Sequence, residues 1–330
     1  MLSRRASLRL LGGAAVAALL ACRPTSRTGP GLRRIGLLQY IDAPPPNASR
    51  DGLIAALRSA GFGSAQGVQL LSRQAGGSER RTQQLAAELV GARPDLLVAI
   101  GTPPLVALLA AAPVTMPLVF CYCSNPWVAG AGRSATQHRP NVTGTITTNP
   151  VAQQLQLARS LVPGLARVGL LYNPAEPNAS FAAELLAQAA AAQQVQLLRE
   201  AIDQPAELAS GFRRLQGQGM QVLLQIGDYI TRQGVAELAA LALRARLPLI
   251  GVDPDYAGLL GCLAVVGWDP RIDGSTAGAM AVRILRGTSP ALLPFEQPGE
   301  PGLWLNRRTA AHLGIALPKA VVATATAVLG

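Results

Sequence analysis

The sequence predicts an α/β protein of two lobes, each a doubly wound parallel sheet, joined by a hinge with a ligand cleft between them. Two patterns support this fold class. Short, continuously apolar segments alternate with helix-like segments, which is typical of parallel strands covered by helices on both faces. The order strand, Ile-Gly, polar residue, helix, Pro-Leu also occurs twice, over residues 96–120 and 222–252. Such a repeat favours two similar lobes, and 330 residues suffice for about two domains.

The first half of the chain contains five apolar runs with the character of strands. They cover residues 34–39, 68–72, 95–100, 117–123 and 142–146. A helix is expected over 49–60, after a turn made by the three prolines 44–46. Ser78 is a suitable cap for a second helix that runs to residue 90. A third helix is expected to have Thr102 as its cap and Pro103 at its first position, where proline needs no N–H partner.

The second half repeats the alternation. Strands are expected over 167–172, 195–200, 221–226, 248–252 and 262–267, and helices over 150–163, 176–191, 205–217 and 229–246. A last long helix is expected to start at Asp269-Pro270, with the aspartate as cap, and to end near residue 287. A strand and helices complete the chain.

Residues 1–22 have the pattern of an export signal. Arg4, Arg5 and Arg9 precede an apolar stretch over 10–21, which is shorter than the ~20 residues of a membrane-spanning helix. Ser3-Arg4-Arg5 resembles a twin-arginine signal, with the Sec route left open. Leu19-Leu20-Ala21-Cys22 resembles a lipobox, in which Cys22 carries a lipid anchor; a plain signal peptide with an incidental cysteine is the alternative. Residues 23–32 have the composition of a polar tether.

Charge and motif content argue against several classes of function. The net charge is +11, yet the arginines are scattered along the chain, and a nucleic-acid-binding protein would gather them on one face. Two histidines and four cysteines provide little material for a metal cluster. The sequence contains no G-x-S-x-G, P-loop or H-E-x-x-H motif. We therefore expect neither catalysis nor a metal, a cofactor or a nucleic-acid partner.

Aromatic residues gather where the expected strands end. Seven of the eight Tyr and Trp residues fall at these junctions, namely Tyr40, Tyr122, Trp127, Tyr172, Tyr229, Tyr256 and Trp268. Because ligands bind beyond the carboxyl ends of parallel strands, this pattern predicts an apolar-walled cleft. Tyr and Trp also favour half-wet positions generally, which accounts for part of the pattern without a ligand.

Acidic residues at the same junctions suit a zwitterionic ligand. Asp228, Asp253, Asp255 and Asp269 could pair with a ligand ammonium group. The helix starts at 102–103 and 124–125 could offer backbone N–H groups to a ligand carboxylate. An aspartate at a helix start is, however, more often a simple cap, and Asp269 is the plainest example.

The cysteines of the expected strand 117–123 allow two interpretations. Cys121 and Cys123 are two residues apart, so they should point to the same face of the sheet. Either could pair with Cys262 in an oxidising compartment, or all three could be free core residues.

Over about residues 33–328 the chain resembles the ABC transporter substrate-binding proteins of the tryptophan and aromatic amino-acid type. The motifs that carry the resemblance begin with RRIGLLQYIDAPPPNASRDGLIAAL and AAELVGARPDLLVAIGTPP, and continue with NVTGTITTNP, RVGLLYNPAEPNA, WDPRIDGSTAGAMAVRILRG and LWLNRRTAAHLGIALP. The resemblance implies a type I periplasmic-binding-protein fold that closes on a small ligand by hinge motion. It also implies delivery of that ligand to a membrane permease without catalysis.

Carried over by motif, the resemblance implies a set of ligand contacts. These are Gln39, Tyr40, Thr102, Ser124, Asn125, Tyr172, Asn173, Asp228 and Asp269, to which the strand-end pattern adds Tyr229, Asp253 and Trp268. One segment departs from the family pattern, because Ser124-Asn125-Pro126 stands where an acidic turn is usual.

The expected lobes are discontinuous in sequence. One lobe should hold 33–147 and about 271–296, and the other 148–270 and about 297–330, with hinge crossings near 147, 270 and 297. The protein is expected to be an exported monomer, periplasmic or held at the membrane through Cys22. Two other functions are left open: a ligand-sensing module for a membrane sensor and, with less support, a secreted two-lobed enzyme that uses Asp228 and Asp269.

Overall fold

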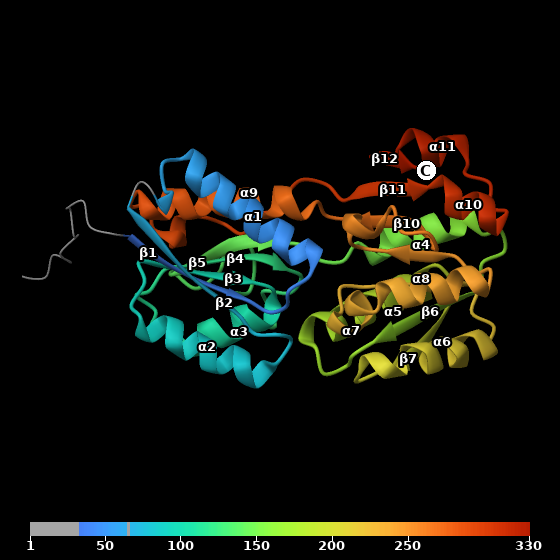
Figure 1. The fold of residues 1–330 in the computed structure, drawn as a ribbon, viewed down its shortest axis with the longest axis horizontal. Helices are drawn as coiled ribbons and strands as arrows, with labels where there is room; N and C mark the ends of the chain where they lie inside the picture. Colours follow the sequence, from blue (N-terminus) through green and yellow to red (C-terminus); the bar gives the residue numbers. More distant parts are fainter. Residues whose placement is uncertain (1–32, 65–66) are drawn as a thin grey trace, which may run out of the picture. The chain divides into compact units, whose positions relative to one another are not determined.

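The computed structural model describes residues 33–64 and 67–330, which contain two separate sheets (Figure 1). The export signal, Cys22 and the tether predicted above lie outside the described residues. No helix of the described residues combines the length and apolar character needed to cross a membrane. The α/β class with parallel sheets is confirmed, and the two sheets correspond to the two predicted lobes.

The first sheet has five parallel strands in the order β2-β1-β3-β4-β5. The strands are β1 (Arg33–Gln39), β2 (Val68–Gln74), β3 (Leu96–Ile100), β4 (Leu118–Cys123) and β5 (Val142–Ile146). Helices α1 (Pro44–Ser59) and α9 (Pro270–Leu285) cover one face, and α2 (Glu79–Gly91) and α3 (Thr102–Ala111) cover the other (Figure 1). Alternate side chains of β3 enter the two cores, which explains why the strand is apolar throughout.

The second sheet has the order β12-β11-β10-β9-β8-β6-β7. Its strands are β6 (Arg167–Tyr172), β7 (Gln196–Ala201), β8 (Val222–Leu224), β9 (Leu249–Gly251), β10 (Cys262–Gly267), β11 (Gly302–Asn306) and β12 (Ala327–Leu329). Helices α4 (Val151–Leu161) and α5 (Pro177–Ala192) cover one face, whereas α6 (Leu208–Gly217), α7 (Tyr229–Gln233) and α8 (Val235–Arg244) cover the other. The sheet is mixed, because β11 runs antiparallel to β10.

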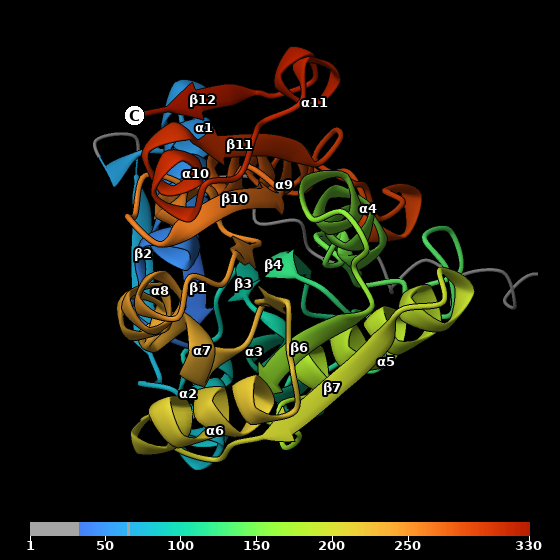
Figure 2. The same ribbon diagram turned by 90° about the vertical axis from the view of Figure 1, so that its right-hand side faces the viewer.

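The C-terminal part of the chain returns to both sheets. Helix α9 follows β10 but packs against α1 of the first sheet, and α10 (Arg307–Leu313) and α11 (Lys319–Ala323) accompany β11 and β12 beside β10 (Figure 2). Short 3-10 turns lie at η2 (Pro205–Glu207), η3 (Pro254–Tyr256) and η4 (Pro290–Leu292). The amide of Ile146 donates to the carbonyl of Glu296 at 2.8 Å, so two of the segments that leave the first sheet lie side by side. The exact lobe limits and the hinge stay predictions.

Three details of the predicted helices are wrong. The prolines 44–46 form no turn but open α1, since the first turn of a helix leaves its N–H groups unpaired and tolerates proline. Thr102 is not the cap of α3; Gly101 is, with a φ of +105° that favours glycine. The predicted helix 229–246 is broken at Gly234, where a Cβ would overlap the side chain of Leu208.

The expectation that Cys121 and Cys123 share one face is also wrong. Cys121 packs toward α1 and α9, whereas Cys123 packs toward α2 and α3. The residue between them, Tyr122, has a φ of +53°, and the pairing of β4 with β5 shifts register there. This bulge reverses the alternation of the strand. Cys121, Cys123 and Cys262 are buried and free, which favours their interpretation as core residues.

Candidate ligand site

A cavity of about 70 Å³ lies at the carboxyl ends of strands from both sheets. Its lining includes Tyr40 after β1, Gly101 after β3 and Tyr122 at the end of β4, together with Gly227 after β8 and Trp268 after β10. This is the place where parallel sheets bind ligands, because loops and helix starts converge there. None of the described residues forms a group of three or more His, Cys, Asp or Glu side chains fit to hold a metal ion.

Four aromatic side chains form much of the cavity wall. The rings of Tyr40 and Tyr229 meet edge to face with their centroids 6.0 Å apart, although they follow strands of different sheets. The Tyr40 hydroxyl donates to the carbonyl of Gly77 at 2.8 Å, and a Cβ on Gly77 would stand 2.6 Å from the Tyr229 ring. Trp268 donates its indole N–H to the carbonyl of Thr148 at 2.8 Å. The polar ends of Tyr40 and Trp268 are thus satisfied, and their rings can offer apolar surface to a ligand.

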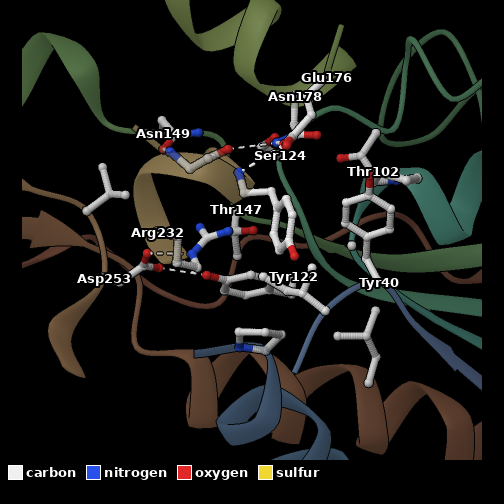
Figure 3. A pocket seen from close by; sticks show the side chains of 18 of the residues that line it. Tyr40, Thr102, Tyr122, Ser124, Thr147, Asn149, Glu176, Asn178, Arg232 and Asp253 are labelled. Carbon is white, nitrogen blue, oxygen red and sulfur yellow. Dashed lines mark hydrogen bonds and ion pairs between the residues drawn. The ribbon is translucent and has the colours of Figure 1, made fainter. Parts of the chain in front are cut away.

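A buried ion pair lies at one end of the cavity. Arg232 Nε donates to Asp253 Oδ2 at 2.8 Å, and both side chains are less than 10% exposed. The Tyr122 hydroxyl donates to the other oxygen of Asp253 at 2.6 Å, and the guanidinium carbon lies 5.3 Å from the centre of the Tyr122 ring (Figure 3). Burial opposes the charge of Arg232, but the charge and hydrogen bond of Asp253, together with Tyr122 and Tyr256, outweigh burial and raise the pKa of Arg232. The guanidinium therefore stays charged.

The two terminal nitrogens of Arg232 donate no hydrogen bond to residues 33–64 and 67–330. Within these residues the Arg232 side chain donates through Nε alone, so both Nη groups keep their N–H donors. Arg232 belongs to the cavity lining, as does Thr147 (Figure 3). A planar pair of unpaired N–H donors in a buried site suits a carboxylate.

A buried carboxyl group belongs to the same lining. Glu176 is 4% exposed and accepts the backbone N–H of Tyr229 at 3.1 Å to each oxygen. Asn178 Nδ2 donates to Glu176 at 3.2 Å and to the carbonyl of Gly227 at 2.7 Å. Burial and the nearby Asp228 raise the pKa of Glu176 to about 7.

Asn178 leaves one polar atom without a partner. Because its Nδ2 serves two acceptors, the opposite Oδ1 must be the acceptor end. Oδ1 is buried and has no hydrogen-bond partner among the described residues. Asn149 also faces the cavity, where its Oδ1 accepts the N–H of Gly227 at 2.8 Å. The site thus holds a free acceptor near a carboxyl group and free donors on Arg232.

Six of the twelve predicted ligand contacts line the cavity. They are Tyr40, Thr102, Ser124, Tyr229, Asp253 and Trp268. Thr102 belongs to the first turn of α3, but Pro103 and Pro104 follow it, so that turn offers far fewer free N–H groups than predicted. Asp253 contacts the arginine of its own lobe, which removes it as a direct partner for a ligand ammonium.

The other six predicted contacts do not line the cavity. Asp228 and Asp269 cap α7 and α9, with backbone N–H groups of Thr231 and Arg271 as donors at 2.7 and 2.8 Å. Asp228 also accepts the N–H of Asn173 at 2.7 Å. These carboxylates therefore serve as helix caps, the alternative given above for an aspartate at a helix start, and their contact with a ligand stays a prediction.

The remaining four have local partners. The Gln39 amide donates to the carbonyl of Ile41 at 2.6 Å, and the Asn125 side chain accepts the N–H of Val128 at 3.0 Å. Asn173 closes a turn by accepting the N–H of Ala175 at 3.0 Å, and Tyr172 packs on the core between the second sheet and α4 and α5. Polar residues after a strand often serve such turns, and the part of these four residues in ligand binding stays a prediction.

The sequence reasoning missed several lining residues, and three of them carry the chemistry of the site. Glu176 and Asn178 lie within the motif RVGLLYNPAEPNA, whose strand-end position was noted without singling out either side chain. Arg232 lies four residues after Asp228 on α7, so the two share a helix face, and that spacing was the available signal.

Comparison with known proteins places the chain in a family. Residues 34–329 match the family model for ABC transporter substrate-binding proteins. A "Tyrosine-binding protein" of Clostridioides difficile strain R20291 is 24% identical over 277 residues, which cover 84% of this chain and 79% of the relative. A conserved domain protein from Vibrio cholerae superposes with a TM-score of 0.85 at 28% identity, covering 90% of this chain and 99% of the other.

A second solved structure shares the fold. The ABC domain from Streptococcus pneumonia in complex with L-Trp superposes with a TM-score of 0.84 at 24% identity, over 90% of this chain and 99% of the other. The family match covers nearly all the described residues and agrees with the resemblance in the sequence motifs. This chain belongs to the ABC transporter substrate-binding protein family.

Proposed function

We propose that the protein is an exported solute-binding protein that captures an amino acid, of the aromatic class, in this cavity and delivers it to an ABC permease. The observation that carries the proposal is the pairing of opposite charges in one small buried site. The unpaired Nη donors of Arg232 and the carboxyl group of Glu176 both belong to the lining. A zwitterion satisfies both groups at once.

The ligand carboxylate is assigned to Arg232. Its guanidinium is fixed through Nε by Asp253, so little side-chain entropy is lost when the Nη groups bind. Charge-assisted, bidentate Arg–carboxylate pairs are about twice as strong as neutral hydrogen bonds. Asn149 adds an amide group to the same lining.

The ligand ammonium is assigned to Glu176 and Asn178. An ammonium group supplies three donors, and the unpartnered Asn178 Oδ1 and the Glu176 carboxylate supply acceptors. An unpaired buried acceptor costs about 1–3 kcal/mol, which a ligand donor would recover on binding. A bound ligand cation would also lower the pKa of Glu176, so that its carboxyl group loses its proton.

The aromatic class rests on the cavity wall and on the relatives. Tyr40, Tyr229 and Trp268 offer ring faces or edges, and two similar proteins carry the names of aromatic amino acids. The cavity of about 70 Å³ is small against the ~300–1,000 Å³ of sites for drug-sized ligands. An aromatic side chain therefore requires the cavity to widen when it binds.

The remaining parts of the proposal follow from the leader and the family. We propose export directed by residues 1–22, a lipid on Cys22 that keeps a monomeric body near its permease, and binding without turnover. The family match supports transport, because its members are named as ABC transporter substrate-binding proteins.

Thermal unfolding in the presence of amino acids tests the proposal. A ligand at 100 times its Kd adds ~2.7 kcal/mol, which should raise the Tm by roughly 5 °C for a body of this size. L-tyrosine or L-tryptophan should raise the Tm, whereas tyrosine methyl ester and N-acetyltyrosine should not, because each lacks one charge. A flat response to all proteinogenic amino acids would refute the ligand class, and equal shifts with the ester would refute the role of Arg232.

A further inference from the structure

Strand β4 contains an irregular residue, Tyr122, one position before its end. Its φ of +53° lies in the left-handed region that residues with a Cβ seldom occupy. The pairing with β5 shifts register between Phe120 and Cys123, and the Tyr122 ring turns into the cavity (Figure 3). Such a backbone conformation persists only where the surrounding structure holds it.

Asp273 holds this residue from outside the cavity. Its fully buried carboxylate on α9 accepts the backbone N–H of Tyr122 at 2.9 Å. Ser49 donates its hydroxyl to the same oxygen at 2.7 Å, and Thr145 donates its hydroxyl to the other oxygen. Burial raises the pKa of Asp273 to about 6, and the three donors oppose that rise. One carboxylate thereby joins α1, β4 and β5 to α9.

Close helix packing fixes the position of Asp273. The next residue, Gly274, lies against α1 so tightly that a Cβ there would overlap the backbone carbonyl of Ser49. Gly278, one turn later, has Ala56 at 2.6 Å from the position of its missing Cβ. Because α9 cannot slide along α1 without a clash, the acceptor for the Tyr122 N–H is held rigidly.

The far end of Tyr122 reaches the other half of the site. Its hydroxyl donates to Asp253 at 2.6 Å, and its ring lies beneath Arg232. Asp253 and Arg232 belong to the half of the chain built on the second sheet, whereas Asp273 and Tyr122 pack on the first. The backbone conformation of Tyr122 therefore decides whether the two halves make their hydrogen bond across the cavity.

We propose that Asp273 is a positioning residue for ligand binding, which holds Tyr122 in its left-handed conformation so that the hydroxyl meets Asp253 when the protein closes. The proposal rests on the proposed function only in its choice of ligand. The claim that Asp273 holds the backbone N–H of Tyr122 does not depend on any ligand.

Variants of Asp273, and of the two side chains that donate to its carboxylate, test this role in the full mature protein. Asp273→Ala should weaken binding of L-tyrosine or L-tryptophan at least tenfold in calorimetry. Ser49→Ala and Thr145→Val each remove one donor to Asp273 but leave the Tyr122 bond, so they should bind within threefold of wild type. Asp273→Asn should retain binding. Its amide oxygen can accept from the Tyr122 N–H, while its NH₂ group donates to the Thr145 hydroxyl.

Hydrogen exchange, followed by mass spectrometry on the peptide that contains Tyr122, provides the readout without ligand. Asp273→Ala should speed exchange of this peptide more than Thr145→Val does at equal loss of Tm. If wild type binds neither amino acid, the ligand class fails while the exchange result still decides the positioning role. Wild-type exchange and affinity in Asp273→Ala, or losses in Thr145→Val and Asp273→Asn as large as those in Asp273→Ala, would overturn the proposal. If Asp273→Ala does not fold, Asp273→Asn replaces it, because a neutral amide oxygen is a weaker acceptor for the Tyr122 N–H than a carboxylate. Faster exchange of this peptide in Asp273→Asn than in Thr145→Val then supports the proposal, and equal or slower exchange overturns it.

Discussion

Replacing Arg232 by methionine tests the central ion pair of the site. Asp253 would remain 4% exposed, with the Tyr122 hydroxyl but no cation beside it. Leaving one charge of a buried pair without its partner costs about 3–5 kcal/mol. At roughly 2–4 °C per kcal/mol for a large domain, the Tm should fall by about 10 °C. Binding of a ligand carboxylate should be lost as well, since the Nη donors are gone.

A matched surface pair separates this effect from the loss of any arginine. Arg199 donates to Glu184 at 2.6 Å, a distance as short as that in the buried pair, but the two side chains are 41% and 65% exposed. Exposed pairs contribute about 0–1 kcal/mol, so Arg199→Met should lower the Tm by no more than ~3 °C. The comparison isolates burial as the cause.

A double-mutant cycle completes the measurement. Asp253→Asn removes the charge that Arg232 compensates and keeps an acceptor for the Tyr122 hydroxyl. The variant with both Arg232→Met and Asp253→Asn should therefore be more stable than Arg232→Met alone, as followed by circular dichroism on heating. If Arg232→Met is no less stable than Arg199→Met, or if the double variant recovers nothing, the ion pair does not hold the site as described.

Two further predictions concern Glu176 and Gly77. Because the pKa of Glu176 is raised to about 7, its carboxyl group gains a proton as the pH falls through 7. The affinity for an ammonium ligand should therefore fall up to tenfold per pH unit below 7. Glu176→Gln should abolish this pH dependence, as measured by calorimetry between pH 5.5 and 8. Gly77→Ala places a Cβ 2.6 Å from the Tyr229 ring at a φ of +77°, so it should weaken ligand binding as well as stability. Gly76→Ala, at a φ of +67° with open space around its Cβ, should cost only the backbone strain, and equal affinity in the two alanine variants would contradict the role of the Tyr229 contact.

Most of the fold could be predicted because its signals are local. The alternation of apolar strands with helices, the cap at Ser78 and the proline after Asp269 act within a few residues, and the structure confirms each. The errors arise where a local signal has two meanings. A run of three prolines can form a loop or occupy the first turn of a helix. Only the packing of α1 decides between these two conformations.

The candidate site was predictable as a place more than as a set of contacts. Tyr40, Tyr122, Tyr229 and Trp268 lie near or shortly after the ends of strands and line the cavity, as the junction pattern predicts. The conformation of Tyr122 could not be predicted, since the sequence of residues 118–123 contains no signal for a left-handed residue inside a strand. Its cause is the Asp273 carboxylate, 151 residues further along the chain.

Asp228 and Glu176 show why the choice among acidic residues needs the tertiary structure. Both precede a helix, and both are candidates for a cap or for a ligand. Asp228 caps α7 by accepting the N–H of Thr231, whereas Glu176 holds the cap position of α5 without a capping bond from its side chain. Glu176 turns instead to the N–H of Tyr229, 53 residues later, and this brings a carboxyl group with a raised pKa to the cavity. A carboxylate whose local partner is unused is the one available for a ligand, and that criterion depends on hydrogen bonds between distant segments.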